Sequence, residues 1–404
     1  MSYIYNNEIK YSDSENLDAF GRLRVSQTTT LLDLKHLYDK LPLLIDEEIG
    51  GSGTSSFSNS SVSMSTTNSG DYVIRQSIKS APYQSGKSQL VEASFSNFAT
   101  QSNVIKRVGY YTSTTNSPYN SGFDGFFLES NGVNNSITFQ LWKGGSNVVT
   151  ATSSSWLTTD YDVSLIDWTK SQLMFVDFQW LGVGRIRFYM FVDGVPKLFY
   201  TTTGANNLST VYMNCPNKPV RYEIRQSGIG SGSFEMICSG VSMEGSINSL
   251  YNTLNISDFT ERTLPLSNTN YAVLGIRLVG TPSQIGVSGA FTTSDILQTS
   301  NDNYLVTIQK SPILSSTASW IKIDNTPIEY SFGSGNITVS TDGFVMGSFM
   351  GKSGALSQEK YEMNDNAFSL GYSINGTPKE WWICIKSTGA NSKFRTGVGV
   401  KYFK

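Results

Sequence analysis

Five acidic residues in the middle of the chain are the first candidates for chemistry, because a pair of carboxylates about 5–9.5 Å apart can hydrolyse a glycosidic bond. They are Asp124, Glu129, Asp177, Glu223 and Glu235. None of them belongs to an ExDxxE-type cluster on a single strand. Asp177 lies between apolar neighbours in the segment MFVDFQW, and we expect it to pair with Arg185 or Arg187 across strands. The sequence therefore predicts no catalytic residue.

The sequence has few residues suited to metal binding or to nucleophilic catalysis. The chain has one histidine, His36, and three widely separated cysteines, Cys215, Cys238 and Cys384. Neither zinc-ligand spacing nor a Ser-His-Asp or Cys-His arrangement can be assembled from them. We predict no metal, no cofactor and unpaired thiols, and we expect His36 to be an ordinary polar residue of a short helix.

Aromatic residues next to polar loops offer a different chemistry, since sugars stack on the rings of Trp and Tyr. Trp142 and Trp156 flank the polar loop 144–155, so both are candidates for glycan contact. Trp168 and Trp180 lie beside strands and are predicted to be core residues. Asp160-Tyr161-Asp162 and Asn301-Asp302-Asn303 could offer oxygen ligands to calcium, but such clusters between strands are usually turns.

The composition indicates the elements that position these residues. Only 15% of the 404 residues are charged, the net charge is −2, and aromatic residues make up 12%. The high aromatic content is not typical of disorder, and the lack of a basic excess predicts no nucleic-acid partner. No apolar run is long enough for a transmembrane helix, and the first residues lack the pattern of a signal peptide. Abundant Ser, Thr, Asn, Gly and aromatic residues favour strands and turns.

Residues 1–50 differ from the rest of the chain and are predicted to be an N-terminal attachment arm. They carry an excess of acidic residues and too few apolar ones to close a core. Apolar residues at 31, 34, 37, 38 and 41 have nearly helical spacing, so we expect a short amphipathic helix there. The predicted assembly residues of this arm are Asp18, Phe20, Gly21, Arg22, Leu23, Arg24, Leu34 and Leu37.

Two β blocks follow the arm. Residues 51–70, rich in Gly and Ser, are predicted to be a linker. About ten antiparallel strands in residues 71–246 predict a two-sheet sandwich or jelly roll. The clearest is 185–193, where Ile186, Phe188 and Met190 alternate with polar or aromatic neighbours before Asp193-Gly194 turns the chain into a hairpin. Residues 247–404 carry a second series and are predicted to be a C-terminal β-sandwich domain.

Four segments resemble a family of virion structural β proteins found in tailed phages and some large DNA viruses. They are DAFGRLRVS (18–26), QWLGVGRIRF (179–188) with the turn at 193–194, VYMNCPNKPVRYEIR (211–225) and LQTSNDNYLVTI (297–308). The resemblance implies a particle component whose central region is similar to concanavalin or laminin-G sandwiches. The amino-acid composition, rich in Asn, Tyr and Ser, is similar to that of proteins from crAss-like phages.

From these observations we expect an all-β virion protein, assembled in the host cytoplasm and present in the particle. The first hypothesis is a homo-oligomeric head fibre or capsid decoration protein, a dimer in preference to a trimer, anchored to other virion proteins such as the capsid. The alternative is a tail-fibre receptor-binding protein that recognises host surface glycan. Neither hypothesis involves catalysis, nucleic acid or membrane insertion.

Overall fold

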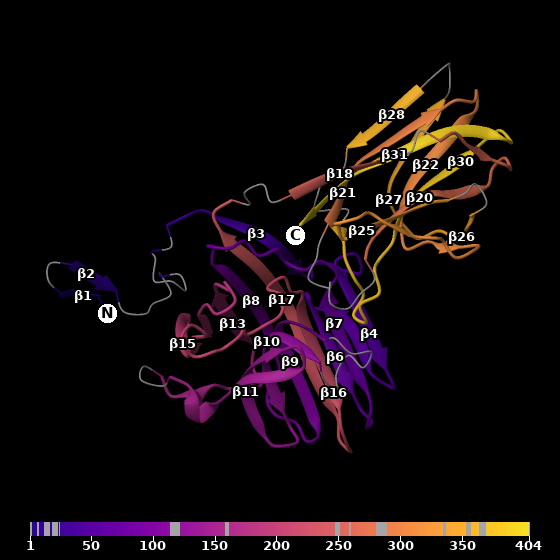
Figure 1. Ribbon diagram of the computed structural model, residues 1–404. Coiled ribbons are helices and arrows are strands. Elements are labelled where there is room, and N and C mark those ends of the chain that lie inside the picture. Colours follow the sequence, from indigo (N-terminus) through magenta and orange to yellow (C-terminus); the bar gives the residue numbers. More distant parts are fainter. Residues whose placement is uncertain are drawn as a thin grey trace. The chain divides into compact units, whose positions relative to one another are not determined.

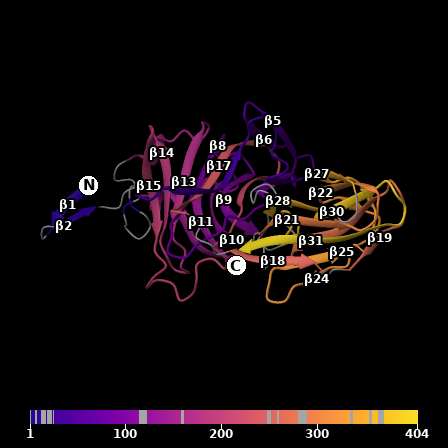
Figure 2. The ribbon, with the colours of Figure 1, turned by 90° about the horizontal axis from the view of Figure 1, so that it is seen from above.

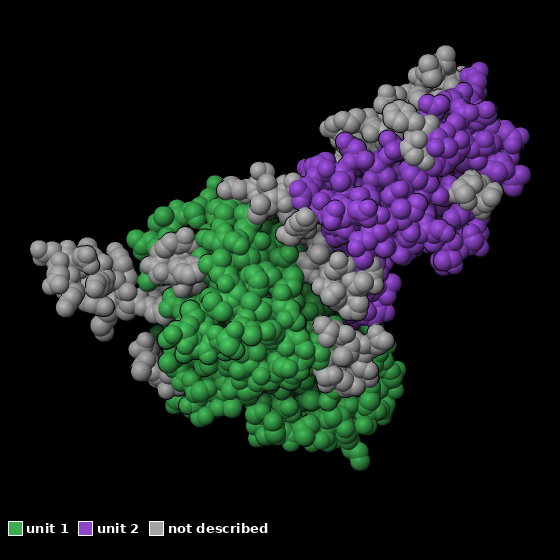
Figure 3. Space-filling model, viewed as in Figure 1, with its two compact units in different colours: residues 1–248 green, residues 249–404 purple. Residues whose placement is uncertain are grey.

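The computed structural model divides the chain into two compact units, residues 1–248 and 249–404, which Figure 3 shows in different colours. The predicted boundary after residue 246 lies close to this division. The structure describes residues 2–5, 8–11, 17, 23, 25–113, 122–157, 161–246, 251–257, 260–279, 289–333, 337–352, 357–362 and 369–403. Within these residues, no helix is both long enough and apolar enough to cross a membrane.

The first unit is built from two antiparallel sheets. One has the order β12-β11-β10-β9-β16-β7-β4, and the other has the order β15-β14-β13-β8-β17-β6-β5, with β3 also paired to β17 (Figure 1 and Figure 2). A separate hairpin joins β1 (Ser2–Tyr5) to β2 (Glu8–Tyr11). The strand bounds are β3 Thr28–Lys35, β4 Ile45–Gly50, β5 Thr54–Ser58, β6 Ser61–Thr66, β7 Tyr72–Ser77, β8 Gln89–Ser96, β9 Val104–Ser113, β10 Phe123–Asn131, β11 Ser136–Lys143, β12 Ser146–Thr152, β13 Gln172–Phe178, β14 Ile186–Val192, β15 Val195–Thr202, β16 Val220–Gln226 and β17 Gly232–Glu244.

One core fills the space between these two sheets, because alternate residues of each strand point inward. In β14, Ile186, Phe188 and Met190 are each at most 1% exposed and belong to this core, as predicted. Asp193 and Gly194 both have positive φ and close the predicted hairpin between β14 and β15. The sheet orders confirm the predicted fold class of an all-β protein with an antiparallel sandwich followed by further β-sheets.

The prediction of a helix over residues 31–41 is wrong. Residues 28–35 form β3, which pairs with β17 and places Leu31, Leu32 and Leu34 in the sandwich core. The register shifts between Val241 and Ser242 of β17, so the inward positions of β3 do not alternate strictly. This bulge explains why the apolar spacing at 31 and 34 resembled that of a helix.

Two further assignments in the N-terminal region are corrected. Residues 45–50 form β4 at the edge of the seven-stranded sheet, so residues 28–50 supply strands to the sandwich and are not a separate arm. The predicted linker 51–70 contains β5 and β6, and Val62 and Met64 of β6 are fully buried. Ser- and Thr-rich stretches form strands here because their inward positions are apolar.

The second unit also has two antiparallel sheets and a core of its own. The orders are β18-β31-β21-β28, with β19 on β31 and β29 on β21, and β24-β25-β20-β30-β22-β27; β23 pairs with β26. Trp381 and Trp382 in β30 are buried within this unit, so their burial needs no second copy of the chain. The bounds are β18 Tyr251–Ser257, β19 Arg262–Leu264, β20 Asn270–Leu278, β21 Gly289–Gln298, β22 Asn303–Lys310, β23 Ile313–Leu314, β24 Ile321–Lys322, β25 Ile328–Phe332, β26 Val339–Thr341, β27 Phe344–Lys352, β28 Ser357–Glu362, β29 Ser369–Leu370, β30 Trp381–Ser387 and β31 Ser392–Phe403.

Candidate functional site

A groove of about 910 Å³ lies in the first unit, where several connections between strands converge. They are the segment after β8, the β10–β11 turn, and the long connection from β12 to β13, which includes two 3₁₀ turns, η1 (Ser153–Ser155) and η2 (Val163–Leu165). Its volume lies in the range of small-molecule sites. The lining residues are Ala99, Thr100, Asn135, Ser136, Ile137, Thr152, Ser153, Ser154, Trp156, Tyr161, Asp162, Val163, Ser164 and Trp168.

Trp156 forms the inner part of this groove. The η1 turn directs the indole toward the sandwich, where its Nε1–H donates to the carbonyl oxygen of Ala151 at 3.1 Å. The ring packs edge-on against Phe199 at 5.5 Å and lies 6.3 Å from the ring of Trp168. With only 5% of its surface exposed, Trp156 is anchored in the core and can offer a ligand little more than part of its ring.

Trp168 is half-buried and is fixed through its backbone. Its carbonyl oxygen accepts the N–H groups of Phe98 and Ala99 at 2.8 and 2.9 Å. The buried Lys106 of β9 donates to the carbonyl oxygens of Asn97 and, at 3.0 Å, Ala99. Lys106 therefore holds the turn after β8, and that turn holds Trp168 in the wall of the groove.

Burial lowers the pKa of Lys106 to about 7. Between pH 7 and the ordinary lysine pKa of 10.5, the unfolded chain binds a proton that the folded chain does not. The free energy of unfolding should therefore rise with pH in this window. We expect Lys106→Met to remove a rise on the order of 3 kcal/mol, measured by urea unfolding at pH 7 and pH 10. Lys170→Met, at an exposed lysine, should leave the rise in place; an unchanged pH dependence in Lys106→Met would contradict this.

Polar groups, most of them neutral, surround the aromatic rings. Thr100 Oγ1 donates to Asn135 Oδ1 at 2.6 Å, and the hydroxyls of Thr152 and Ser154 lie 2.8 Å apart. Asp162 accepts the backbone N–H of Ser164 at 2.9 Å, and hydrogen bonding to Ser164 lowers the pKa of its carboxyl. Aromatic faces beside hydroxyl and amide groups suit a ligand that is apolar on its ring faces and hydroxylated at its edges, as sugars are.

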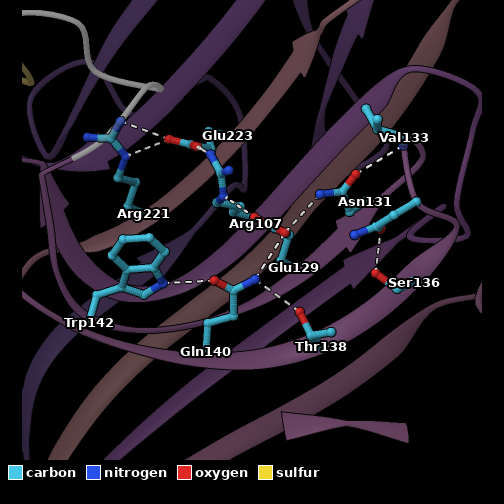
Figure 4. Close-up of polar contacts among 11 residues, drawn as sticks. Arg107, Glu129, Asn131, Val133, Ser136, Thr138, Gln140, Trp142, Arg221 and Glu223 are labelled. Atoms are coloured by element: carbon cyan, nitrogen blue, oxygen red, sulfur yellow. Dashed lines mark hydrogen bonds and ion pairs between the residues drawn. The ribbon is translucent and has the colours of Figure 1, made fainter. Parts of the chain in front are cut away.

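A second polar cluster is formed by side chains of β9, β10, β11 and β16 of the seven-stranded sheet (Figure 4). Arg107 of β9 donates to Glu129 Oε2 at 2.6 Å and also to Glu223. Arg221 donates to Glu223 Oε2 through Nε and Nη2 at 3.0 and 2.8 Å. Gln140 links Glu129 to the indole N–H of Trp142. All four charged side chains are at most 8% exposed.

This arrangement favours a structural role for the two glutamates over acid–base chemistry. Although burial alone would raise it, the pKa of Glu223 is lowered because the charges and N–H groups of Arg221 and Arg107 stabilise its carboxylate. The guanidinium of Arg107 also lies 4.7 Å from the centre of the Phe123 ring. A general acid needs a pKa near the working pH, and ion pairing moves Glu223 in the opposite direction.

The predicted pairing of Asp177 is confirmed, with Arg187 as its partner. Arg187 donates to Asp177 Oδ2 through Nε at 3.1 Å and also through Nη2, and both side chains are fully buried. Asp177 also accepts a hydrogen bond from the hydroxyl of Ser88, and Arg187 donates one to the carbonyl oxygen of Leu17.

Among the described residues, no group of three or more His, Cys, Asp or Glu side chains could hold a metal ion.

The two predicted glycan-contact residues lie in different places. Trp156 lines the groove, but most of its ring is buried, because η1 turns it inward. Trp142 lies in the cluster with Gln140 and packs edge-on against Phe123 at 5.5 Å, outside the groove. Trp168 and Tyr161 were missed as groove residues. For Trp168, the one signal in the sequence is its position in a polar connection between strands, and Tyr161 has no comparable signal.

The predicted assembly residues are dispersed. Leu34 is in the sandwich core, Leu37 is 63% exposed, and Leu23 is half-exposed in a bridge to the buried Leu17. Asp18, Phe20, Gly21, Arg22 and Arg24 lie outside the described residues, and the assembly role of the whole set stays a prediction.

His36 lies outside any helix and is only 1% exposed, with Nδ1 at 2.9 Å from the carbonyl oxygen of Ile237. The expectation of an ordinary polar residue in a short helix is therefore wrong.

No protein-family model matches the chain, and no curated protein sequence matches it significantly. Among solved structures, the carbohydrate recognition domain of Emp47p is 15% identical, with 58% of this chain and 100% of that chain covered and a TM-score of 0.36. A β-1,3-1,4-glucanase (lichenase) derived from a mouse hindgut metagenome is 11% identical, with coverages of 55% and 99% and a TM-score of 0.34. The VIP36 exoplasmic/lumenal domain, in its form bound to Ca²⁺ and Man3GlcNAc, is 10% identical, with coverages of 51% and 87% and a TM-score of 0.32. At these values the likeness does not extend to ligand, activity or partner.

Proposed function

We propose that this chain is a non-enzymatic β protein that binds carbohydrate through the groove of its first unit, as a receptor-binding component of a phage particle. The observation that carries the proposal is the meeting of Trp156, Trp168 and Tyr161 with a rim of hydroxyl and amide groups. Stacking on the rings and hydrogen bonding to the rim are the two interactions that a sugar needs.

The ion pairs of the sandwich support the non-enzymatic part of this proposal. Four of the five acidic candidates are held by buried basic residues: Glu129 by Arg107, Glu223 by Arg107 and Arg221, Asp177 by Arg187, and Asp124 by Lys218. None of these acids lines the groove. Carboxylates that stabilise buried cations are poorly suited to transfer protons to a substrate.

A glycan microarray probed with the whole chain tests carbohydrate binding. We expect binding to at least one oligosaccharide, and Trp168→Ala should weaken it about tenfold or more by removing a half-buried ring from the groove wall. Trp142→Ala is the matched control, since the same residue type is removed far from the groove lining, and it should bind as the unmodified chain does. Equal weakening by both substitutions, or no binding to any glycan, would contradict the proposal.

The particle location rests on the four segments that resemble virion proteins. Segments 179–188 and 211–225 contain Arg187, Arg221 and Glu223, so their residues support the sandwich and do not line the groove. A head fibre or decoration protein built on the same sandwich is therefore the second candidate. Electron microscopy of phage particles labelled with an antibody against this chain separates the two: label at the tail favours receptor binding, and label at the head favours decoration.

Self-association is also part of the proposal, and an edge strand of the second unit supports it. β27 is an edge strand of its sheet and exposes Phe344, Val345 and Met350, the last with 82% of its surface. An apolar edge strand is a surface that a second copy could cover. Light scattering of the purified chain tests this proposal, and a monomer at micromolar concentration would contradict it.

A further inference from the structure

We infer that the groove selects uncharged glycans and rejects carboxylated or sulfated ones. This inference rests on the proposed carbohydrate-binding function and adds the chemical class of the ligand. It starts from the charges of the lining residues that the structure describes, among which there is no Lys, Arg or His. Acidic sugars are usually bound by guanidinium or ammonium groups, and the described residues of the lining offer an anion no such partner.

Among the described residues of the lining, the one carboxyl group is that of Asp162, and it is ionised at neutral pH. Its oxygen accepts the backbone N–H of Ser164 at 2.9 Å, and this hydrogen bonding lowers its pKa. A negative charge on a bound sugar would therefore meet a fixed negative charge in the same groove, with no basic side chain among the described lining residues to offset it.

Lys106 is the cationic residue tied most directly to the groove wall, and it is already engaged. Its Nζ donates to the carbonyl oxygens of Asn97 and Ala99 from within the sandwich, and its side chain is fully buried. Because burial lowers its pKa to about 7, much of its charge is lost at and above neutral pH. Lys106 therefore shapes the wall and contributes little attraction for an anion.

The groups that remain for a ligand are neutral. Thr100 donates to Asn135 Oδ1, which leaves the amide N–H groups of Asn135 for a sugar oxygen. Within the described part of the chain, neither the indole N–H of Trp168 nor the hydroxyl of Tyr161 has a hydrogen-bond partner. Both residues are half-buried and line the groove. Hydroxyl, amide and indole groups recognise sugar hydroxyls without requiring a charge.

Matched oligosaccharide pairs test this inference on the whole chain. Each pair would have the same linkage and length and differ only in carrying C6 carboxylates or hydroxymethyl groups, as in galacturonan and galactan, glucuronan and glucan, or mannuronan and mannan. We expect the neutral member of at least one pair to bind, and its carboxylated partner to bind at least about tenfold more weakly at pH 7.5 in low salt. Isothermal titration calorimetry gives the ratio of the two affinities.

Asp162→Asn is the informative variant, because asparagine keeps an oxygen for the N–H of Ser164 and removes the charge. Asp162→Asn should bring the ratio of the affinities for the neutral and the carboxylated member of a pair closer to one. Asp167→Asn, outside the lining, should leave this ratio unchanged. Equal or tighter binding of the carboxylated member would overturn the inference and leave carbohydrate binding intact. Binding to neither member of any pair, nor to any glycan of the microarray, would overturn the proposed function and this inference with it.

Discussion

Asp177→Asn should destabilise the first unit by about 3–5 kcal/mol. Asp177 and Arg187 are both fully buried, and they face each other directly in the register of β13 and β14. Asparagine is nearly isosteric, but it leaves the guanidinium in the interior without a balancing charge. The measurement is urea unfolding of the unmodified chain and the variant at pH 7, followed by circular dichroism.

Two variants control the Asp177 experiment. Asp193→Asn makes the same chemical change in the exposed β14–β15 turn, where asparagine also tolerates positive φ, and it should shift stability by no more than about 0.5 kcal/mol. Asp177→Leu combined with Arg187→Met removes both charges and should recover much of the loss. If Asp177→Asn were as stable as the unmodified chain, the structural role of this ion pair would be refuted.

Glu223→Gln should cost a similar amount, about 3–5 kcal/mol. Its carboxylate accepts hydrogen bonds from both Arg107 and Arg221, so one substitution removes the shared partner of two buried guanidinium groups. Glu235→Gln is the matched control. Glu235 is half-exposed and accepts one hydrogen bond from Ser96 Oγ at 2.7 Å, so its loss should cost about 1 kcal/mol or less.

Glu223→Gln also distinguishes a structural role of Glu223 from a catalytic one. A catalytic acid or base can usually be replaced by its amide without loss of stability, while hydrolysis of the substrate stops. We expect the reverse, namely a less stable protein and no hydrolysis of host polysaccharide by the unmodified chain. A stable Glu223→Gln variant that lacks a polysaccharide hydrolase activity of the unmodified chain would contradict this account.

The sandwich could be predicted from the sequence because its strands follow simple local rules. Strict alternation in 185–193 and the Asp193-Gly194 turn both depend on neighbouring residues only. The choice between Arg185 and Arg187 as partner of Asp177 could not be made in this way. It depends on the register between β13 and β14, which the surrounding core fixes.

The groove was harder to predict, since its residues come from connections far apart in the sequence. Trp168 is held in the groove wall by hydrogen bonds from the turn after β8, about 70 residues earlier in the chain. No pattern of neighbouring residues predicts such a long-range contact. Trp156 was found by its position beside a polar loop, but that position did not indicate that η1 buries most of its ring. Residues 31–41 misled because β3 has a bulge at Leu31, which interrupts its alternation.

The most direct test of carbohydrate binding is a titration of the ¹⁵N-tryptophan-labelled chain with a neutral oligosaccharide that binds on the microarray. Each indole N–H gives its own nuclear magnetic resonance signal, and single Trp→Phe substitutions assign those of Trp168, Trp156 and Trp142. We predict the largest shift at Trp168, a smaller one at Trp156 and none at Trp142. Shifts at Trp142 with none at Trp168 would place the ligand elsewhere and contradict the account.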